Sequence, residues 1–520
     1  MKTLFYHAAN IDALVCEDGI ILETGSFDTL RQKYPEAETH DFEGGTVYPG
    51  FADTHLHILN YAITHRGLEL GGVRSKAELL TLLREKAKTL PEGEIIQGRG
   101  FNEDLWDDNT LPTADELECG SHPVRLVRVC GHMELANRKM MERMGIDADT
   151  PVPEGGIVDI EKGIFTENAI GLLYGQEQDE GVEKCKELLH EGMCAAVKSG
   201  LTALFTDDLG TGGFAPDTVA QAYRELEKEG RMPLRIVQQC ALPDDEALDS
   251  FIEKGYTYGF GSDMYRIGPR KLYADGSLGA HTAYLSEPYA DRPDTRGVPV
   301  QTQESLNHHI AYAHEKGFPC IVHAIGDAAA ELVLNAVDHA RKQVPGTEHL
   351  RDGIVHRQIT SKQQLMRIRD MHVDVYAQPV FTEYDLHICR ERVGEAREKT
   401  SYNWKTLYDT GVCISSGSDC PVETFSPAAN IYCAVYRMDY DGFPEGGWMP
   451  GQRLSFAEAI ACHTEKAGEA SGMKIGRLEK GYLADMTVYA EPLETMEPEK
   501  LIHAMPKYTV VGGKTVMIRE

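Results

Sequence analysis

Two histidines one residue apart, His55 and His57, occur in the segment DTHLH (53–57), directly after Pro49-Gly50-Phe51. In a β-strand, residues i and i+2 point to the same side, so both imidazoles can reach one metal ion. The alternative is that one histidine packs in the core while the other is solvated. The pair indicates a metal site only if further ligands lie nearby.

Two more histidines end apolar, β-branched runs further along the chain. His323 closes Ile-Val-His (321–323) and His356 closes Ile-Val-His (354–356), 33 residues apart. Taken singly, each is more typical of a hydrogen-bonded core histidine than of a metal ligand. Their equivalent places in consecutive βα units indicate that both lie at the same rim of a barrel.

A carboxylate and an amine complete the set of candidate ligands. Asp419, in SGSDCPVE (416–423), can bind a metal and take a proton from an activated water, or it can simply cap a turn. Lys271, in RKLYADGSLG (270–279), lies in a predicted strand. A buried amine has a lowered pKa and can react with CO2 to give a carbamate that bridges two cations. The alternative is a snorkelling or ion-paired surface lysine.

Four histidines, one aspartate and a lysine carbamate are sufficient ligands for two divalent ions, and imidazole with carboxylate suits Zn2+ best. Such ions bring the pKa of water toward neutrality and polarise a carbonyl, which is the chemistry of amide, urea, carbamate or ester hydrolysis. An enzyme with one ion and an unmodified Lys271 stays open as an alternative.

These candidates lie at the ends of short apolar segments that alternate with helical patterns. The segments end near residues 55, 207, 239, 274, 323, 356, 377 and 418. Eight strands alternating with helices predict an α/β fold, a (β/α)8 TIM-like barrel whose active site lies at the carboxyl ends of the strands.

The spacing of these segments also predicts the domains. Residues 55 and 207 are 152 positions apart, whereas the other intervals run from 21 to 49. We therefore expect an inserted α+β subdomain at 71–185, over the active site, and a hydrolase barrel at 51–70 and 186–474. Short β segments separated by turns at both chain ends predict a β-sandwich domain from 1–50 and 475–520.

Composition excludes several classes of protein. The 520 residues include 52 basic and 82 acidic side chains, a net charge of −30, which opposes binding to nucleic acid or anionic membranes. The 12 cysteines include no CxxC pair, and no run of about 18 apolar residues is present. We expect a cytoplasmic protein with reduced thiols whose partner is a small-molecule substrate, with a homodimer as the assembly to test.

In the segments around these residues, the sequence resembles the amidohydrolase superfamily, and within it the amidohydrolase-3 group of YtcJ-like proteins and N-substituted formamide deformylase. The segments that carry the resemblance are PGFADTHLH (49–57), KLYADGSLGA (271–280), HAIGD (323–327), HRQ (356–358), SGSDCPVE (416–423) and GRLEKGYLADMTVY (476–489). It implies a barrel beside a β-sandwich built from both chain ends, with an insertion after the first strand.

The resemblance also implies a role for each candidate. His55 and His57 would bind the more buried metal, carboxylated Lys271 would bridge both ions, and His323 and His356 would bind the second. Asp419 would bind metal and act as general base, then as acid toward the leaving amine. Trp106 and His132, in segments that overhang the site in the family, are candidate substrate contacts. Many relatives read DGSLGSR where this chain has Ala280-His281, so His281 is a candidate for altered specificity.

The sequence therefore predicts a metal-dependent hydrolase that cleaves a C–N bond of a small N-acyl, N-formyl or carbamate compound. A hydrolytic deaminase or a cyclic-amide hydrolase would use the same ligands. A non-catalytic small-molecule-binding or regulatory protein on this scaffold is the alternative from another class. Seven aromatics are expected near the barrel mouth, as an apolar pocket or as ordinary packing: Phe101, Trp106, Tyr273, Tyr376, Phe381, Tyr384 and Trp404.

Overall fold

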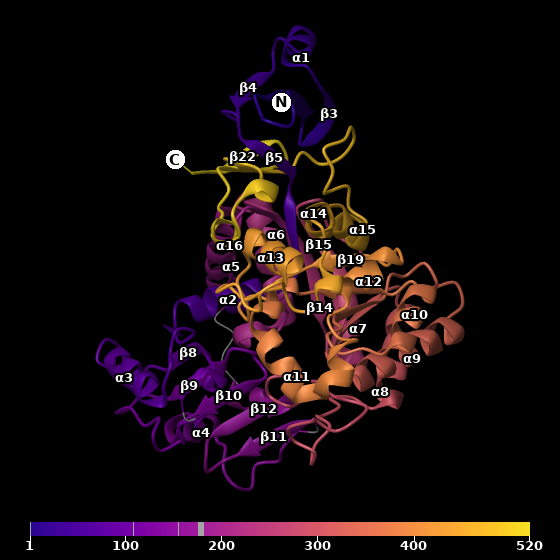
Figure 1. Cartoon of the computed structure of the whole chain (residues 1–520). Helices are drawn as coiled ribbons and strands as arrows, with labels where there is room; N and C mark the ends of the chain where they lie inside the picture. The colour runs from indigo at the N-terminus through magenta and orange to yellow at the C-terminus, as the bar shows by residue number, and fades with distance from the viewer. Residues whose placement is uncertain (1, 108, 154, 175–180, 520) are drawn as a thin grey trace.

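The computed structural model describes residues 2–107, 109–153, 155–174 and 181–519, and its centre is a parallel eight-stranded sheet rolled into a barrel (Figure 1). Neighbouring strands pair in chain order, and the predicted (β/α)8 barrel is confirmed. All eight strands end within two residues of the predicted positions. They are β6 (Phe51–Leu56), β13 (Leu201–Asp207), β14 (Arg235–Ala241), β15 (Tyr265–Tyr273), β16 (Cys320–Ala324), β17 (Gly353–His356), β18 (Asp374–Ala377) and β19 (Ile414–Ser416).

The first and last strands meet through the segment that follows β19. The Asp419 amide donates to the His55 carbonyl at 2.8 Å, and the His57 amide donates to the Cys420 carbonyl at 2.8 Å. Gly417 passes so close to β6 that a Cβ atom there would lie 2.6 Å from the His55 nitrogen. A side chain at 417 would separate the two strands, so this contact requires glycine.

Helices surround the barrel and bury apolar faces against it, as α9 does through Val333, Ala336, Val337 and Ala340. Their bounds are α2 (Ile58–His65), α5 (Gly181–Lys198), α6 (Pro216–Lys228), α7 (Asp245–Glu253), α8 (Gln303–Glu315), α9 (Asp327–Gln343), α10 (Lys362–Asp370), α11 (Thr382–Glu398), α12 (Trp404–Asp409), α13 (Pro427–Tyr436), α14 (Phe456–His463) and α15 (Glu465–Ser471). No described helix is long and apolar enough to cross a membrane.

Between α2 and α5 the chain leaves the barrel and builds a separate six-stranded sheet with its own apolar core, at the lower left of Figure 1. Within the expected insertion at 71–185, residues 108, 154 and 175–180 lie outside the described residues. Its elements are β7 (Leu68–Glu69), α3 (Lys76–Ala87), β8 (Ile96–Phe101), β9 (Val124–Arg128), β10 (Met133–Ala136), α4 (Arg138–Met144), β11 (Gly156–Asp159) and β12 (Ile164–Glu167).

The two ends of the chain lie together at the top of Figure 1. Two four-stranded sheets share one apolar cluster, in which Phe5, Leu14 and Phe42 pack with Met486 and Val510. The elements are β1 (Lys2–Tyr6), β2 (Ala13–Glu17), β3 (Ile20–Gly25), α1 (Phe27–Lys33), β4 (Glu38–Asp41), β5 (Thr46–Pro49), β20 (Met486–Tyr489), α16 (Pro498–Ile502), β21 (Tyr508–Val511) and β22 (Lys514–Ile518).

Candidate active site

The first cluster of candidate ligands lies where the first and last strands meet. The Nε2 atoms of His55 and His57 lie 3.4 Å and 3.1 Å from the same oxygen, Oδ1 of Asp419. The donor atoms of these three residues all lie within 4.8 Å of one another. His57 directly follows β6, and its Nε2 points to the same carboxylate oxygen as that of His55.

The other nitrogen of each imidazole is fixed by a hydrogen bond. Nδ1 of His55 donates to Oε1 of Gln239 at 2.6 Å, and the Gln239 amide nitrogen donates to the Thr54 carbonyl, which sets the amide orientation. Nδ1 of His57 donates to the Asp207 carbonyl at 2.9 Å. Because Nδ1 is occupied in both rings, Nε2 is the nitrogen left to bind a metal ion; Nε2 of His57 hydrogen-bonds Oδ1 of Asp419 at 3.1 Å, a contact that a bound cation would replace.

His323 and His356 lie side by side on adjacent strands, with ring centroids 4.5 Å apart. Nδ1 of His356 donates to Oε1 of Gln378 at 2.8 Å, which leaves its Nε2 free. Nε2 of His323 donates to the Gly276 carbonyl at 3.1 Å, so its Nδ1 is free. The His356 ring also lies 5.6 Å from that of His55, which joins the two histidine pairs into one arc.

Lys271 enters the barrel interior from β15 between these pairs. Its Nζ makes no hydrogen bond with the described residues, although Oδ2 of Asp207 lies 3.5 Å away and the Tyr273 ring centroid lies 3.7 Å away. Burial lowers the pKa of Lys271, against the opposing effect of Asp207. An amine in this position is a better nucleophile than an exposed lysine.

The protonation states suit cation binding. Burial holds the pKa values of His55 and His323 well below the ordinary range and lowers that of His356 to about 4, so all three are neutral imidazoles near pH 7. Burial alone would raise the pKa of Asp419. The hydrogen bond from His57 outweighs burial and holds that pKa well below its usual range, and the neighbouring histidines add to the effect at the low pH where they are protonated.

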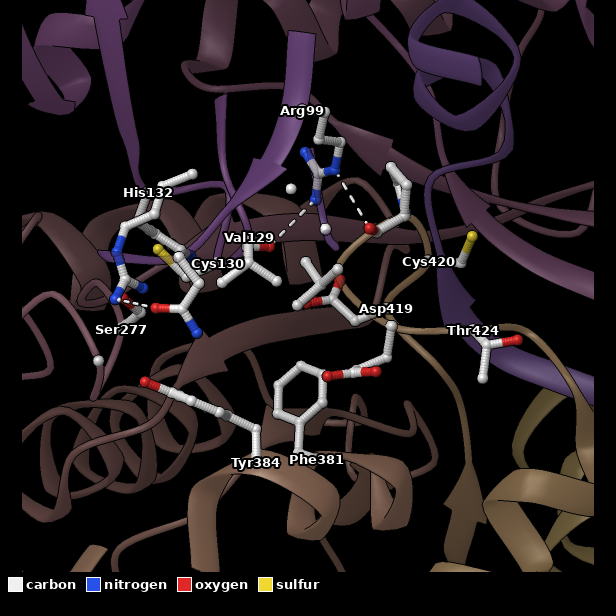
Figure 2. Close-up of a pocket in the computed structure, with 18 of the residues that line it drawn as sticks. Arg99, Val129, Cys130, His132, Ser277, Phe381, Tyr384, Asp419, Cys420 and Thr424 are labelled. Carbon is white, nitrogen blue, oxygen red and sulfur yellow. Dashed lines mark hydrogen bonds between the residues drawn. The ribbon is translucent and has the colours of Figure 1, made fainter. Parts of the chain in front are cut away.

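A cavity of about 540 Å³ opens above His323, His356 and Asp419, between the barrel and the inserted sheet. Figure 2 shows Phe381 and Tyr384 on one wall, with His132, Val129 and Cys130 of the insertion opposite. Nδ1 of His132 lies 2.8 Å from Oε2 of Glu167, and its ring centroid is 5.0 Å from that of His323. Burial opposes protonation of His132, but Glu167 raises its pKa to about 9.

A comparison with known families agrees with this geometry. The model described as "Amidohydrolase family" matches residues 38–517. The chain belongs to the amidohydrolase family. A short segment, 13–37, also matches a bacterial imidazolonepropionase-like composite domain.

Among curated proteins, this amidohydrolase is 32% identical to YtcJ of Bacillus subtilis, over 99% of this chain and 97% of that protein. It is 26% identical to N-substituted formamide deformylase of Arthrobacter pascens, over 92% of this chain and 89% of that enzyme. Among solved structures, an uncharacterized metal-dependent hydrolase from Pyrococcus horikoshii is 26% identical with a TM-score of 0.79. That match covers 96% of this chain and 99% of the other.

Two predicted substrate contacts lie away from the cavity of the amidohydrolase. Trp106 is 3% exposed in the apolar core of the insertion, where its Nε1 donates to the Val73 carbonyl at 3.1 Å. His281 has φ +59, and its Nε2 lies 2.9 Å from Oδ2 of Asp291. Neither is among the described residues that line the cavity, whereas His132 is. Hydrogen bonds to Val73 and Asp291 hold the side chains of Trp106 and His281 away from the cavity.

The expected aromatic pocket is likewise only partly present. Phe381 and Tyr384 line the cavity, and the Phe381 ring stacks on His356 with centroids 5.8 Å apart. Tyr273 donates to Oδ2 of Asp207 at 2.6 Å beneath the site. The other four pack in apolar cores: Phe101 and Trp106 in the insertion, Tyr376 inside the barrel and Trp404 among its helices.

Several residues that shape the site carry no motif. From the sequence, positions 207 and 239 mark only strand ends, and Gln378 and Arg99 have no assigned role. The available signal was an amide side chain within or just after an apolar strand, since a buried amide must find hydrogen-bond partners. Gln239 and Gln378 find theirs in the histidines of the site.

Proposed function

We propose that this protein is a metal-dependent hydrolase that cleaves the C–N bond of a small amide, N-acyl, N-formyl or carbamate compound. The observation that carries the proposal is the orientation of the imidazoles. Gln239, Gln378 and two backbone carbonyls each occupy one nitrogen of a histidine, which leaves the other nitrogen of each ring for a cation. Those of His55 and His57 lie 3.4 Å and 3.1 Å from Oδ1 of Asp419. Such an arrangement is expected of a metal centre and serves no purpose in an ordinary core.

The residues fit two divalent cations, with Zn2+ the best match to nitrogen and carboxylate ligands. His55 and His57 would hold one ion with Asp419, and His323 and His356 the second. The buried Lys271 amine, which lacks a hydrogen-bond partner among the described residues, would bridge them as a carbamate. When bound, such cations activate water and polarise the scissile carbonyl.

The protein's own groups would then manage the protons. Asp419 is ionised and faces the cavity, so it would accept the proton of the attacking water and return it to the leaving nitrogen. His132 is held protonated by Glu167 and would donate a hydrogen bond to the oxygen on which negative charge develops. Residues of the insertion form part of the cavity lining, so a bound substrate would displace water from between the insertion and the barrel.

The test begins with metal content per chain, measured by plasma mass spectrometry on protein purified without chelators or an added metal-binding tag. We expect about two equivalents, as four histidines and a bridging carboxylate allow. A panel of N-formyl, N-acyl, carbamate and heterocyclic substrates is then scored separately for formate, free amine and ammonia. We expect Asp419→Asn to retain the fold and lose about 10³-fold or more in kcat, as for loss of a general base.

Each outcome selects among the candidate functions. Release of ammonia alone would indicate a deaminase, and opening of a ring without release would indicate a cyclic-amide hydrolase. About one equivalent of metal would favour the single-ion version. Absence of metal before and after its addition would overturn the proposal in favour of a binding protein. Full activity in both His57→Ala and Asp419→Asn would overturn the assignment of these residues to the metal centre.

A further inference from the structure

Arg99 places a buried positive charge on the cavity wall. It lies near the end of β8 in the insertion and is 5% exposed. Its Nε donates to the Pro421 carbonyl at 3.1 Å, and Nη2 donates to the Val129 carbonyl at 3.4 Å. Figure 2 shows the guanidinium between the loop of Cys420 and the segment of Val129 and Cys130. Arg99 thus contacts the two loops that carry Asp419 and His132.

The backbone of β8 is shaped to aim this side chain. The register of β8 against β9 shifts between Arg99 and Phe101, which is the signature of a β-bulge. Gly100, the extra residue, has φ +97, and a Cβ atom there would lie 3.0 Å from both Oε1 of Glu69 and the Gly71 nitrogen. Bulges of this kind redirect a side chain at the end of a strand, here toward the cavity.

No described carboxylate lies within 4.0 Å of the Arg99 guanidinium. Glu69 is its register partner on β7, but the Glu69 carboxylate accepts from the Gly71 amide at 3.0 Å instead. Asp385, on another wall, accepts from Gln358 at 2.8 Å and from Tyr402 at 2.7 Å. Among the described residues, two backbone carbonyls accept hydrogen bonds from Arg99 and the charge of Asp419 acts on it from a greater distance, so this buried cation lacks a contacting anion.

The other arginines show that this arrangement is particular to Arg99. Arg128 also borders the cavity, but Glu103 and Asp104 neutralise it at 2.9 Å and 2.7 Å. Arg357 and Arg437 are buried without a described carboxylate, yet neither lines the cavity. Nη1 of Arg99 makes no hydrogen bond with the described residues and, unlike the unpartnered nitrogens of those two, is not sealed in the core.

We propose that Arg99 binds a carboxylate of the substrate, which makes the preferred substrates N-acyl or N-formyl compounds that carry an acid group. A guanidinium edge matches the two oxygens of a carboxylate, and the pairing is strong where water is excluded. A chain of net charge −30 repels anions in general. A buried cation in the cavity therefore supplies a local attraction for a carboxylate that the rest of the surface does not. That the bound compound is a substrate rests on the proposed function, whereas the binding of its carboxylate by Arg99 does not.

Binding to the full chain is measured by titration calorimetry with matched pairs: N-benzoylglycine against N-benzoylglycinamide, and N-acetylphenylalanine against its amide. Each pair differs at one group of similar size, an anionic carboxylate in the acid and a neutral carboxamide in the amide. Four chains are compared: wild type, Arg99→Gln, Arg99→Lys and the control Arg74→Gln. Arg74 lines the same cavity but is exposed, so its loss removes an equal charge without a buried site.

We expect wild type and Arg74→Gln to prefer the acids over the amides by about 30-fold or more, as for a buried charge pair. Arg99→Gln should lose that preference, and Arg99→Lys, which keeps the charge without the fork, should retain part of it. Equal binding of acids and amides to wild type would overturn the proposal. So would an acid preference that survives in Arg99→Gln, because the acids would then bind elsewhere, for example at the metal ligands.

The wild-type ratio of acid to amide keeps the proposal falsifiable even if Arg99→Gln does not fold. It also separates the two proposals. An acid preference that depends on Arg99, in a chain that hydrolyses none of the panel, would retain this inference and overturn the proposed function. Hydrolysis of acids and amides with equal kcat/KM would retain the proposed function and overturn this inference about Arg99.

Discussion

Nε2 of His57 lies 3.1 Å from Oδ1 of Asp419, although the two residues are 362 positions apart in the chain. The contact exists because β6 and the segment after β19 meet at the barrel seam, where two backbone hydrogen bonds of 2.8 Å join them. One seam therefore both closes the fold and forms the site. Loss of pairing at this seam would remove three candidate ligands together.

Lys271→Met should lower the metal content from about two equivalents per chain to about one, because the bridging group is gone. The methionine fills a similar volume, but it leaves the buried Asp207, whose Oδ2 lies 3.5 Å from the Lys271 amine, without its cation. The metal-free variant should therefore unfold at a lower temperature than metal-free wild type. Metal content and thermal unfolding are measured on the same preparations.

Carbon-13 bicarbonate provides the control for this variant. A labelled carbamate signal should appear in the NMR spectrum of the metal-loaded wild type and be missing from Lys271→Met. Two equivalents of metal in the variant would show that Lys271 does not bridge the ions.

Gln239→Leu and Gln378→Leu should each weaken metal affinity by about 10- to 100-fold, as loss of a residue that orients a ligand does. Each change keeps the approximate size of the side chain but removes the oxygen that fixes His55 or His356. Because the two glutamines serve different histidines, each variant should weaken a different ion. Competition with a chelator of known affinity measures both constants.

Gln238→Leu is the matched control for these two variants. Gln238 neighbours Gln239 on β14 and is equally buried, but it donates to backbone carbonyls of Thr206 and Gln239 rather than to a histidine. It should lower stability and leave metal affinity unchanged. Equal loss of affinity in all three variants would mean that the effect is general loosening of the barrel.

The sequence predicted the parts of the site that depend on strand ends and missed those that depend on contacts across strands. His323 and His356 follow from the barrel count, since each ends a strand, and the eight strands fall where the spacing indicated. Gln378 and Gln239 act on residues 22 and 184 positions away, through strand neighbours that no local pattern encodes.

Residues outside the strands were harder to predict, for a related reason. The direction of His281 depends on a left-handed backbone conformation and on Asp291, ten positions later. Trp106 follows a short turn, and its indole nitrogen donates a hydrogen bond to the Val73 carbonyl. Arg99 points to the cavity because of a bulge at Gly100. A motif gives the type of such a residue, but a single hydrogen bond or bulge decides where its side chain points.

Arg235→Leu should destabilise the protein by about 3–5 kcal/mol, the cost of leaving a buried charge without its partner. Arg235 begins β14 and forms two hydrogen bonds to Asp485, of 2.6 Å and 2.8 Å, with both side chains at most 3% exposed. This pair joins the barrel to the strands of the terminal domain. Urea denaturation, followed by fluorescence and by circular dichroism, measures the loss.

The exposed pair Lys254–Asp217, 2.8 Å apart, is the control, and Lys254→Leu should cost less than about 1 kcal/mol. The double variant Arg235→Leu/Asp485→Asn should recover part of the stability that Arg235→Leu loses, because the unpaired carboxylate is then gone. If Arg235→Leu lowers the free energy of unfolding no more than Lys254→Leu does, the Arg235–Asp485 pair does not hold the barrel and the terminal domain together.

His463 should make the fold sensitive to acid. It lies 2% exposed at the end of α14, where its Nδ1 bonds the Ala52 carbonyl of β6 at 3.0 Å, and burial lowers its pKa from 6.5 to about 4. Above pH 6.5 the imidazole is neutral in both the folded and the unfolded chain. As the pH falls from 6.5 toward 4, only the unfolded chain gains the proton, so stability falls by about 3 kcal/mol across that window.

His463→Gln removes the titrating group and keeps a side-chain N–H that can donate to the Ala52 carbonyl. The free energy of unfolding of this variant should therefore decline less between pH 6.5 and pH 4 than that of the wild type, by about 3 kcal/mol over the window. The same substitution at His349, which is exposed, should leave the wild-type pH dependence unchanged. Urea titrations at several pH values give the comparison. Parallel curves for wild type and His463→Gln would show that this histidine is not held neutral by burial, and that other groups cause the acid sensitivity.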